Sequence, residues 1–409
     1  MFISLKNLGK RAFVVLVLFV LCAVLPAAVS ASADSGNSSG EWMKEFSLED
    51  GSVAAVWQMS DGDIVAAGSG ENGSEIFGLG PDGNISWKKD IGGGENSSAV
   101  FVQESPLGGL YLFTSDEELV KTDDSGNVEW TYRQPYGVIS SIEVADNGNV
   151  LMAGDYLQSF LIMISPEGNE TWNKTLDTPD GGGQYRLSSV QQMSDGEFVV
   201  AGYINPIMYT ENYRGFMMKI NEEGNVSWAK QYKYKDSAMI TTVAPLEDGG
   251  LAAGLNKITE GASDNNTEIV PYILITDSGG YQKTMFNVPG VEVVYYVTEA
   301  PDKGFYMLGT EENTLAGSDE YEYKLLKTDN AGSLEVSKSF GETRINSLQQ
   351  TLNGEILMAG SDTGSGNGVI IKIMPGDLEK ETNSSKSPGF GYVIAVLGAV
   401  CAAAIRLKK

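Results

Sequence analysis

The chain contains no histidine and only two cysteines among its 409 residues. Without histidine, no side chain has an ordinary pKa near neutrality that would suit a general base. Ser-His-Asp and Cys-His nucleophile systems are excluded outright. Cys22 and Cys401 both fall in apolar terminal segments, so the region between them has neither a thiol nor a disulfide. That region must be stabilised by packing, and a metal there would find only oxygen ligands.

Basic residues are scarce, with 28 Lys and Arg against 54 Asp and Glu and a formal net charge of −26. This balance argues against binding to nucleic acid or to an anionic membrane surface, because both require basic patches. Calcium is the cation to consider, through the loop ASDNNTE or the pair Asp61 and Asp63. Neither has EF-hand spacing, and a hairpin turn explains Ser-Asp-Gly-Asp. We therefore expect no bound metal and no cofactor.

Both ends of the chain carry apolar segments. Residues 1–33 have the basic stretch MFISLKNLGKR, an apolar run and the small residues VSASA, which predicts a signal peptide; an uncleaved signal anchor is the alternative. Residues 34–40 and 376–387 are polar linkers. The apolar stretch from Phe390 to Leu407 would form about 27 Å of helix, nearly enough to cross a membrane, and the basic residues after it would stay in the cytoplasm.

The segment between the linkers repeats a unit of about 49 residues. Arg186 to Tyr232 predicts four short strands, separated by turns such as Ser-Asp-Gly and Asn-Glu-Glu-Gly-Asn. The glycine that closes the second strand recurs at Gly68, Gly154, Gly202, Gly254, Gly309 and Gly360, with Thr114 in its place in one repeat. A sheet of four strands cannot bury both of its faces alone, so it needs copies of itself on either side.

The two ends of the repeat region are incomplete and complement each other. Trp42 lies in a segment like a fourth strand with no strands before it, and the last repeat lacks its fourth strand. We therefore predict an all-β, seven-bladed propeller over 41–375, with blades at 53–90, 99–133, 138–175, 186–232, 239–286, 293–340, and 344–374 completed by 42–46. Closing the ring in this way would pair edges that a linear array leaves open.

The loops between the second and third strands are longest in blades 4 to 6. Because these loops emerge on one face of the disc, we expect a raised rim there that binds a partner. The aromatic candidates for this surface are Tyr203, Tyr209, Tyr213 and Trp57. Packing of the loops by these same tyrosines is the alternative interpretation.

The recurrent turn and strand PDGNISW, DSGNVEW, PEGNETW and EEGNVSW resembles the blade motif of propellers with PQQ-like repeats. The resemblance implies that a Trp on each outer strand stacks between neighbouring blades. The matching residues are Trp42, Trp87, Trp130, Trp172 and Trp228, whereas Lys283 and Val336 depart from the motif. Some members are quinone-dependent dehydrogenases, which would supply adjacent cysteines that this region lacks.

The C-terminal segment 388–409 resembles the PGF-type sorting signal of archaeal surface proteins. Pro388, Gly389 and Phe390 form the tripeptide, and the apolar helix and basic tail follow in order. The resemblance implies cleavage by an archaeosortase-like enzyme and transfer to a membrane lipid. A tail anchor that is never cut is the alternative.

Asn-x-Ser/Thr sequences make N-glycosylation an expectation for an exported chain. They occur at Asn37, Asn72, Asn84, Asn96, Asn169, Asn173, Asn225, Asn265 and Asn383.

Two functions follow from these observations. The first is a non-enzymatic, glycosylated propeller on the outer face of the cell membrane or in the envelope, which acts as a scaffold or binds a surface protein or glycan. The alternative is a secreted hydrolase, such as a glycosidase, that uses a carboxylate pair in the propeller funnel. The sequence singles out no particular pair.

Overall fold

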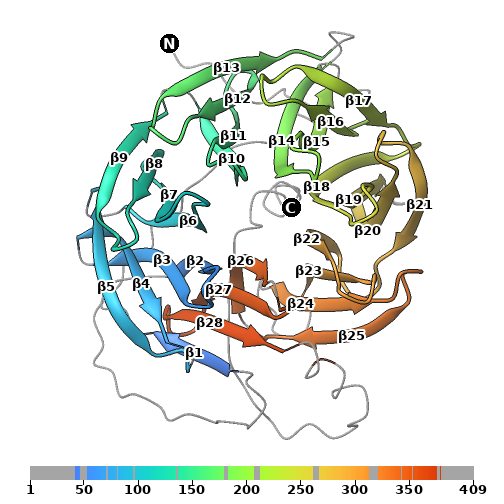
Figure 1. Cartoon of the computed structure of the whole chain (residues 1–409). Coiled ribbons are helices and arrows are strands. Elements are labelled where there is room, and N and C mark those ends of the chain that lie inside the picture. The colour runs from blue at the N-terminus through green and yellow to red at the C-terminus, as the bar shows by residue number, and fades with distance from the viewer. Residues whose placement is uncertain are drawn as a thin grey trace, which may run out of the picture.

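The computed structural model describes residues 42–46, 53–70, 72–80, 82–94, 97–134, 137–178, 183–206, 212–260, 267–312, 321–341, 343–351, 353–374 and 378. These residues form 28 strands in seven four-stranded antiparallel sheets, arranged as the blades of a wheel (Figure 1). The predicted all-β, seven-bladed propeller is therefore confirmed. The expected signal peptide, the linker at 34–40 and the C-terminal helix with Pro388, Gly389 and Phe390 lie outside the described residues. Of the expected polar linker at 376–387 only Leu378 is described, and it is buried against the core of blades 6 and 7.

In blades 1 to 6 the strands follow the chain from the innermost to the outermost position, and in blade 7 the outermost strand is the first of the chain. Blade 1 holds β2 (Val53–Gln58), β3 (Ile64–Gly70), β4 (Gly73–Leu79) and β5 (Ile85–Gly92); blade 2 holds β6 (Ala99–Glu104), β7 (Leu110–Thr114), β8 (Glu118–Thr122) and β9 (Val128–Arg133); blade 3 holds β10 (Val138–Val144), β11 (Val150–Asp155), β12 (Ser159–Ile164) and β13 (Glu170–Leu176). Blade 4 holds β14 (Gly183–Gln192), β15 (Phe198–Pro206), β16 (Arg214–Ile220) and β17 (Val226–Tyr232); blade 5 holds β18 (Ser237–Pro245), β19 (Leu251–Glu260), β20 (Thr267–Thr276) and β21 (Gln282–Asn287). Blade 6 holds β22 (Val293–Glu299), β23 (Phe305–Glu312), β24 (Tyr321–Thr328) and β25 (Leu334–Ser339); blade 7 holds β26 (Thr343–Gln350), β27 (Ile356–Asp362) and β28 (Gly368–Ile373) and is completed by β1 (Trp42–Phe46).

Strand β1 closes the ring. It pairs antiparallel with β28 in a regular register that runs from Trp42 opposite Lys372 to Phe46 opposite Gly368. Without β1, the outer edge of β28 would present a row of unpaired backbone groups. The order β1-β28-β27-β26 is the closure that the two incomplete ends of the repeat region predict.

The turns between third and fourth strands depend on glycine. In blade 4 the N–H of Asn221 donates to the carbonyl of Asn225 at 3.0 Å, and the N–H of Gly224 donates back to the carbonyl of Asn221 at 2.8 Å. Gly224 has φ of +69°, a left-handed conformation that a residue with a side chain rarely adopts. The repeated glycine in the turn motif therefore fixes the hairpin in successive blades.

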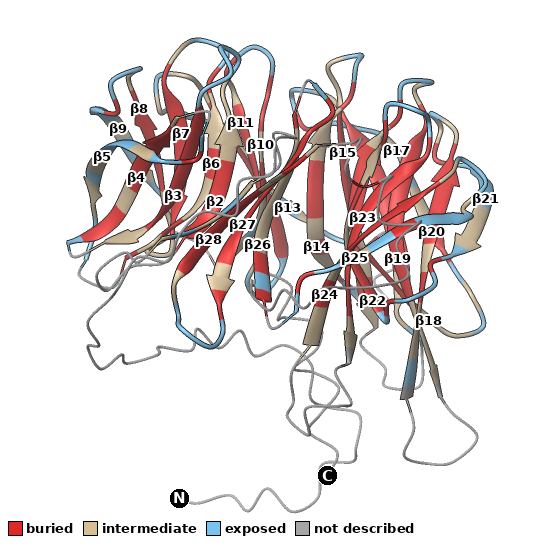
Figure 2. Ribbon diagram, turned by 90° about the horizontal axis from the view of Figure 1, so that it is seen from below, coloured by how far each residue is buried: buried red, intermediate tan, exposed pale blue. Residues whose placement is uncertain are grey.

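The hydrophobic core lies between blades. One cluster joins Leu151 and Leu161 of blade 3 to Val200 and Phe216 of blade 4, and all six residues of β12 are buried. Figure 2 shows this burial running through the full depth of the disc. Burying a large aliphatic or aromatic side chain stabilises the fold by about 1.5–3 kcal/mol. Each blade therefore depends on both neighbours for most of its stability.

The two faces of the disc differ in how far their loops and hairpins project. The turns between first and second strands and between third and fourth strands are short and share one face, while the hairpins between second and third strands extend from the other (Figure 2). Strands β19 and β20 have ten residues each and form the longest of these hairpins. Within the described ranges, no helix is long and apolar enough to cross a membrane.

Candidate binding site at the central channel

Every innermost strand carries a β-bulge at the same place. The register against the second strand shifts by one residue in all seven blades. A bulge leaves one residue out of the ladder and turns its side chain in a new direction. The bulged residues are Ala54, Val100, Ser140, Ser188, Thr241, Tyr295 and Asn346.

Several bulged side chains tie one blade to the next. Ser188 donates its hydroxyl hydrogen to the carbonyl of Ile240 at 2.8 Å, and Thr241 donates to the carbonyl of Val294 at 2.6 Å. Asn346 donates from Nδ2 to the carbonyl of Val53 at 3.1 Å, across the junction where the ring closes. In each case the acceptor is the residue just before the bulge of the next blade.

The residue after the bulge accepts from the next blade in a similar way. The N–H of Val190 donates to Ser141 Oγ at 3.0 Å, and the N–H of Val243 donates to Ser189 Oγ at 3.2 Å. An innermost strand has no neighbouring strand on the channel side, so its outward N–H and C=O groups need other partners. The serine and threonine side chains of the preceding blade supply them.

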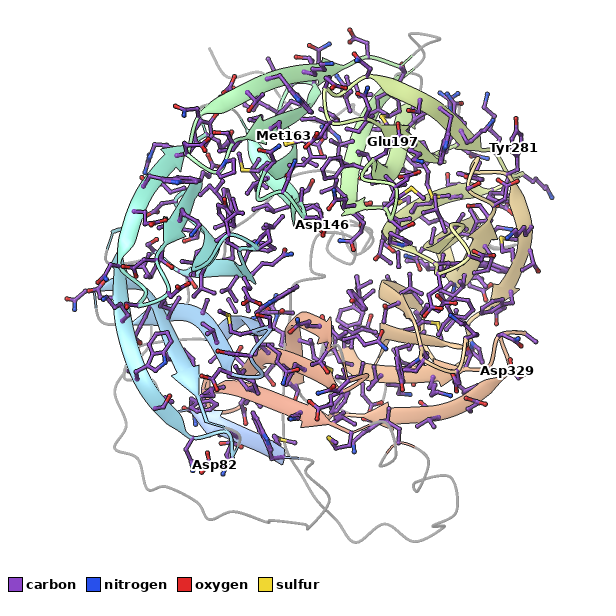
Figure 3. All side chains as sticks on the ribbon, viewed as in Figure 1. Asp82, Asp146, Met163, Glu197, Tyr281 and Asp329 are labelled. Carbon is purple, nitrogen blue, oxygen red and sulfur yellow. The ribbon has the colours of Figure 1, made fainter. Side chains whose placement is uncertain are left out.

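Glu143 is a carboxylate on the innermost strand of blade 3. Its Oε1 accepts the backbone N–H of Gln192 at 3.1 Å, and its Oε2 accepts Nε2 of Gln191 at 3.1 Å. Burial raises the pKa of Glu143 to about 8, the hydrogen bond from Gln192 opposes this, and the charge of Asp146 adds to it. Asp146 lies beside the central opening (Figure 3). At the same position in blade 7, neutral Gln349 accepts the N–H of Gln58 at 2.6 Å.

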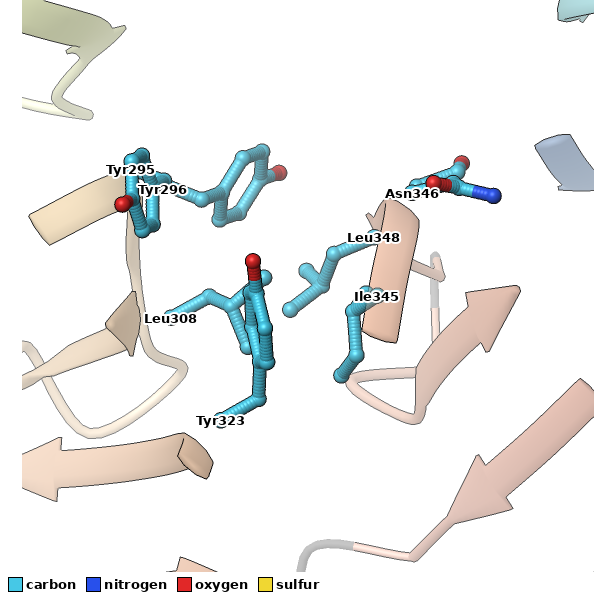
Figure 4. Close-up of a pocket in the computed structure, with 8 residues that line it drawn as sticks. Tyr295, Tyr296, Leu308, Tyr323, Ile345, Asn346 and Leu348 are labelled. Atoms are coloured by element: carbon cyan, nitrogen blue, oxygen red, sulfur yellow. The ribbon is translucent and has the colours of Figure 1, made fainter. Parts of the chain in front are cut away.

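Blade 6 departs from this pattern at the bulge. Tyr295 and Tyr296 occupy the two positions where blades 3, 4 and 5 have Ser or Thr. Beside them a cavity of about 110 Å³ opens between blades 6 and 7 (Figure 4). Its wall is formed by Tyr295, Tyr296, Leu308, Tyr323, Ile345, Asn346, Ser347 and Leu348.

The aromatic side of this cavity contains a stacked pair of rings and neutral phenols. The rings of Tyr295 and Tyr323 are stacked, with centroids 6.4 Å apart and planes at 25°. Burial raises the pKa of both Tyr296 and Tyr323 to about 12. Both phenols are therefore protonated at neutral pH.

Three of the five tryptophans lie against the next blade in the same manner. Each indole N–H donates to the carbonyl two residues before the turn glycine: Trp130 to Pro166 at 2.9 Å, Trp172 to Glu222 at 2.8 Å and Trp228 to Ser278 at 3.1 Å. The rings cover the space that a Cβ on Gly168, Gly224 or Gly280 would enter. Trp42 covers Gly83 of blade 1 similarly, so the closing strand also takes part.

Trp87 lies elsewhere. Its indole covers Gly78 of the adjacent strand in its own blade, and the residue is 40% exposed. The residue opposite the corresponding Trp is Lys121, Lys219 or Lys372 in blades 2, 4 and 7. Because glycine at 78 leaves this space empty, the indole folds onto its own sheet. The expected stacking between blades 1 and 2 is therefore wrong for Trp87.

The residue equivalent to Trp228 in blade 5 is Thr284 and not Lys283. Trp228 pairs with Lys219 just after a bulge, and Thr284 pairs with Ile275 in the same relation. The left-handed turn glycine is the second of Gly279 and Gly280, which shifts the strand by one residue. Phe286, two residues further on, covers Gly332 of blade 6 in place of a Trp.

The other sequence candidates are dispersed. Of the glycosylation candidates, Asn72, Asn84, Asn169 and Asn225 are exposed and Asn173 is half-buried, while Asn37, Asn96, Asn265 and Asn383 lie outside the described residues. Tyr203 and Tyr213 pack edge-to-face on each other, with centroids 5.6 Å apart. Trp57 packs against the core between blades 1 and 2, and Tyr209 lies outside the described residues.

The structure does not group further oxygen ligands around the described residues of either calcium candidate. The carboxylate of Asp61 accepts the N–H of Asp63 at 3.0 Å, which is the bonding of a hairpin turn. Most of the loop ASDNNTE lies outside the described residues. Among the side chains that the structure describes, no three His, Cys, Asp or Glu residues are arranged to hold a metal ion.

The recurrent turn and strand motifs do not include the residues that line the cavity. A signal was present, because aligning the repeats on their second-strand glycine puts the pair Tyr295-Tyr296 opposite Ser140-Ser141 of blade 3 and Ser188-Ser189 of blade 4. The sequence does not distinguish Glu143 from the other acidic residues, of which the chain has 54 in all; the structure places it at the junction of blades 3 and 4.

Comparison with known proteins agrees with this architecture. The WD40 domain of Pan2 from Neurospora crassa is 10% identical with a TM-score of 0.52, covering 87% of this chain and 99% of that one. Virginiamycin B lyase from Staphylococcus aureus is 12% identical with a TM-score of 0.53, covering 82% and 100%. The propeller of Cps50 (Swd1) from Myceliophteria thermophila is 12% identical with a TM-score of 0.54, covering 82% and 99%. Identities this low show the fold alone.

A search of curated proteins finds no match. The family of PQQ-like repeats described as outer membrane protein assembly factor BamB matches residues 30–253, which is more than half of the chain. The matched range begins before β1 and ends in β19 of blade 5. Together with the seven four-stranded blades, this match shows that the chain belongs to the BamB-like PQQ-repeat family of β-propellers.

Proposed function

We propose that this protein is a non-enzymatic binding propeller of the cell envelope, exported by residues 1–33 and held at the outer face of the membrane through residues 388–409. The observation that carries the proposal is the use of the channel side chains. The side chains of Ser141, Ser189 and Glu143 accept hydrogen bonds from backbone N–H groups of the next blade. These hydrogen bonds join neighbouring blades, which supports a structural role for the three side chains.

The binding surface in this proposal is the face from which the long hairpins extend. Family membership supports an envelope role, since the family is described as an assembly factor of outer membrane proteins. The β19–β20 hairpin projects furthest along this face (Figure 2). On its flank, Nζ of Lys257 lies 4.1 Å from the ring centroid of Tyr234 and 4.6 Å from that of Tyr272. Such cation–π contacts stiffen the base of a hairpin that would meet a partner.

Chemical cross-linking of the tagged full-length protein in its native cells, followed by mass spectrometry, tests this proposal. We expect one recurring envelope partner. Replacing residues 257–270 by an Asn-Gly turn should abolish its capture, whereas Tyr281→Ala on the opposite face should leave capture unchanged. Equal capture by both variants would contradict the proposed surface. Steady turnover of any glycoside by the purified protein would contradict the non-enzymatic assignment.

Anchoring and glycosylation are separate parts of the proposal. The supporting features are the ordered Pro388-Gly389-Phe390, apolar segment and basic tail, and the exposed sequons in the third-to-fourth-strand turns at Asn84, Asn169 and Asn225. Mass spectrometry of the mature protein should find a C-terminus near residue 388 carrying lipid, and glycan on these asparagines. An intact Lys409 in the surface form would contradict processing by an archaeosortase-like enzyme.

A further inference from the structure

The cavity between blades 6 and 7 lies where other junctions are joined by short polar side chains. At the junctions of blades 4 and 5 and of blades 5 and 6, the carbonyls before the bulge accept from Ser188 and Thr241. The equivalent carbonyl in blade 7 belongs to Ile345. A tyrosine carries its hydroxyl at the far end of its ring, so Tyr295 and Tyr296 cannot reproduce the short serine or threonine bond. Residues of β22 and β26 instead line the cavity together.

The same substitution affects the N–H groups of the blade 7 edge. In blades 4 and 5, the N–H groups of Val190 and Val243 donate to a serine of the preceding blade. The equivalent N–H in blade 7 is that of Leu348, which also lines the cavity. By equivalence with blades 4 and 5, the wall formed by β26 offers a backbone acceptor at Ile345 and a backbone donor at Leu348. The tyrosine side chains line the cavity on the other side (Figure 4).

The chemistry of the lining defines the ligand. The eight lining residues comprise three phenols, one amide, one hydroxyl and three aliphatic side chains, and none is charged at neutral pH. A charged group would lose its hydration here, and no charged side chain in the lining would pair with it; the nearby charges that act on the lining are those of Arg344 on Tyr323 and Glu143 on Tyr296. The group that enters is therefore neutral, with an apolar face for the rings and hydroxyl or amide groups for the polar wall.

We propose that this cavity binds a single neutral pyranose ring at the end of a surface glycan. The C–H face of the sugar would pack on the Tyr296 ring, and its hydroxyls would bond the polar edge from Ile345 to Leu348. The cavity of about 110 Å³ is somewhat smaller than the ~150 Å³ that encloses benzene in an engineered protein core. It therefore admits part of one ring and leaves the remaining chain in the central opening. This inference rests on the proposed binding role and names the partner class.

Saturation-transfer NMR and calorimetry with the full-length protein in detergent test this site. The probes are the methyl glycosides of glucose, galactose, mannose and N-acetylglucosamine, with glucuronic acid, choline and N-acetyltyrosine amide as charged, cationic and peptide-like comparisons. We expect at least one neutral methyl glycoside to bind. Tyr296→Ala should weaken it at least tenfold, and Tyr296→Phe, which keeps the ring and loses the hydroxyl, should weaken it several-fold. Tyr281→Ala, an exposed tyrosine on the rim of blade 5, is the matched control and should bind as the wild type does.

Thermal melts show which variants are folded. If Tyr296→Ala does not fold, binding by Tyr296→Phe tests the site in its place. Absence of binding by every neutral glycoside, binding of choline or the tyrosine amide alone, or glycoside binding that neither Tyr296 variant weakens would each overturn the proposal. Partner capture by cross-linking is a separate readout. If Tyr296→Phe captures the envelope partner normally while glycosides fail to bind, the sugar site is wrong and the binding role stands. If capture also fails in the wild type, both are wrong.

Discussion

The indole N–H of Trp228 in blade 4 donates to the carbonyl of Ser278 in blade 5 at 3.1 Å, while its ring covers Gly280 of the same turn. One side chain thus satisfies a turn carbonyl and fills the space above a glycine of the neighbouring blade. The same arrangement at Trp130 and Trp172 shows how the wheel is joined at its rim.

Replacing Trp228 by Ala should destabilise the protein more than replacing Trp87. Trp228→Ala removes an inter-blade contact and leaves a turn carbonyl without its partner, which should lower the free energy of unfolding by about 3 kcal/mol. Trp87→Ala removes a ring that is 40% exposed and lies on its own blade. Thermal melts of the two variants check this. Equal losses of stability would show that the inter-blade position has no special weight.

Gly280 and Gly196 form a matched pair that separates backbone strain from packing. Both have positive φ, +74° and +83°, so Ala at either position carries about 1–2 kcal/mol of strain. A Cβ on Gly280 would also lie 2.7 Å from the Trp228 ring, whereas one on Gly196 meets nothing within 4 Å. Gly280→Ala should therefore melt at a clearly lower temperature than Gly196→Ala. In the Trp228→Ala background, most of this difference should disappear, because only the contact at 3.0 Å with Cγ of Lys230 is left.

Glu143 should make stability depend on pH between about 4.5 and 8. Burial raises its pKa to about 8 in the folded protein from an ordinary value of 4.5, so the folded state holds the proton more tightly across this range. Its contribution to stability is thus complete below pH 4.5 and is lost as the pH rises through 8. Denaturant titrations at several pH values should show wild-type stability falling relative to Glu143→Gln as the pH rises.

A reciprocal variant serves as the control for Glu143. Gln349 occupies the same place in blade 7 and accepts the N–H of Gln58. Gln349→Glu should introduce a similar loss of stability with rising pH, because the site would bury a carboxylate in the same way. Parallel pH curves for wild type, Glu143→Gln and Gln349→Glu would contradict the assignment of the effect to this position.

The wheel could be predicted from the sequence because its signals are local and repeated. Each turn glycine acts within its own hairpin, and the two incomplete ends of the repeat region define where the ring closes. The position of Trp87 could not be predicted from its motif, since it is decided by Gly78 on the adjacent strand. The register of blade 5 depended on which of Gly279 and Gly280 has the positive φ.

The hydrogen bonds between innermost strands and the cavity could not be predicted from the sequence motifs, for a different reason. Ser141 meets Val190, and the tyrosines of β22 face β26, so each contact joins residues about 50 positions apart in the chain. No single repeat contains both partners. Only the angular placement of the blades brings them together.

Closure of the ring by β1 is tested most directly by a disulfide. Met43 lies opposite Ile371 in the register of β1 and β28, and the propeller has no cysteine of its own. Oxidation of a variant with Met43→Cys and Ile371→Cys should link these two positions, seen by mass spectrometry as one cross-linked peptide. The offset pair Met43→Cys and Val369→Cys should link far less. Equal linking of both pairs, or none in the folded protein, would contradict a wheel whose last blade is completed by its first strand.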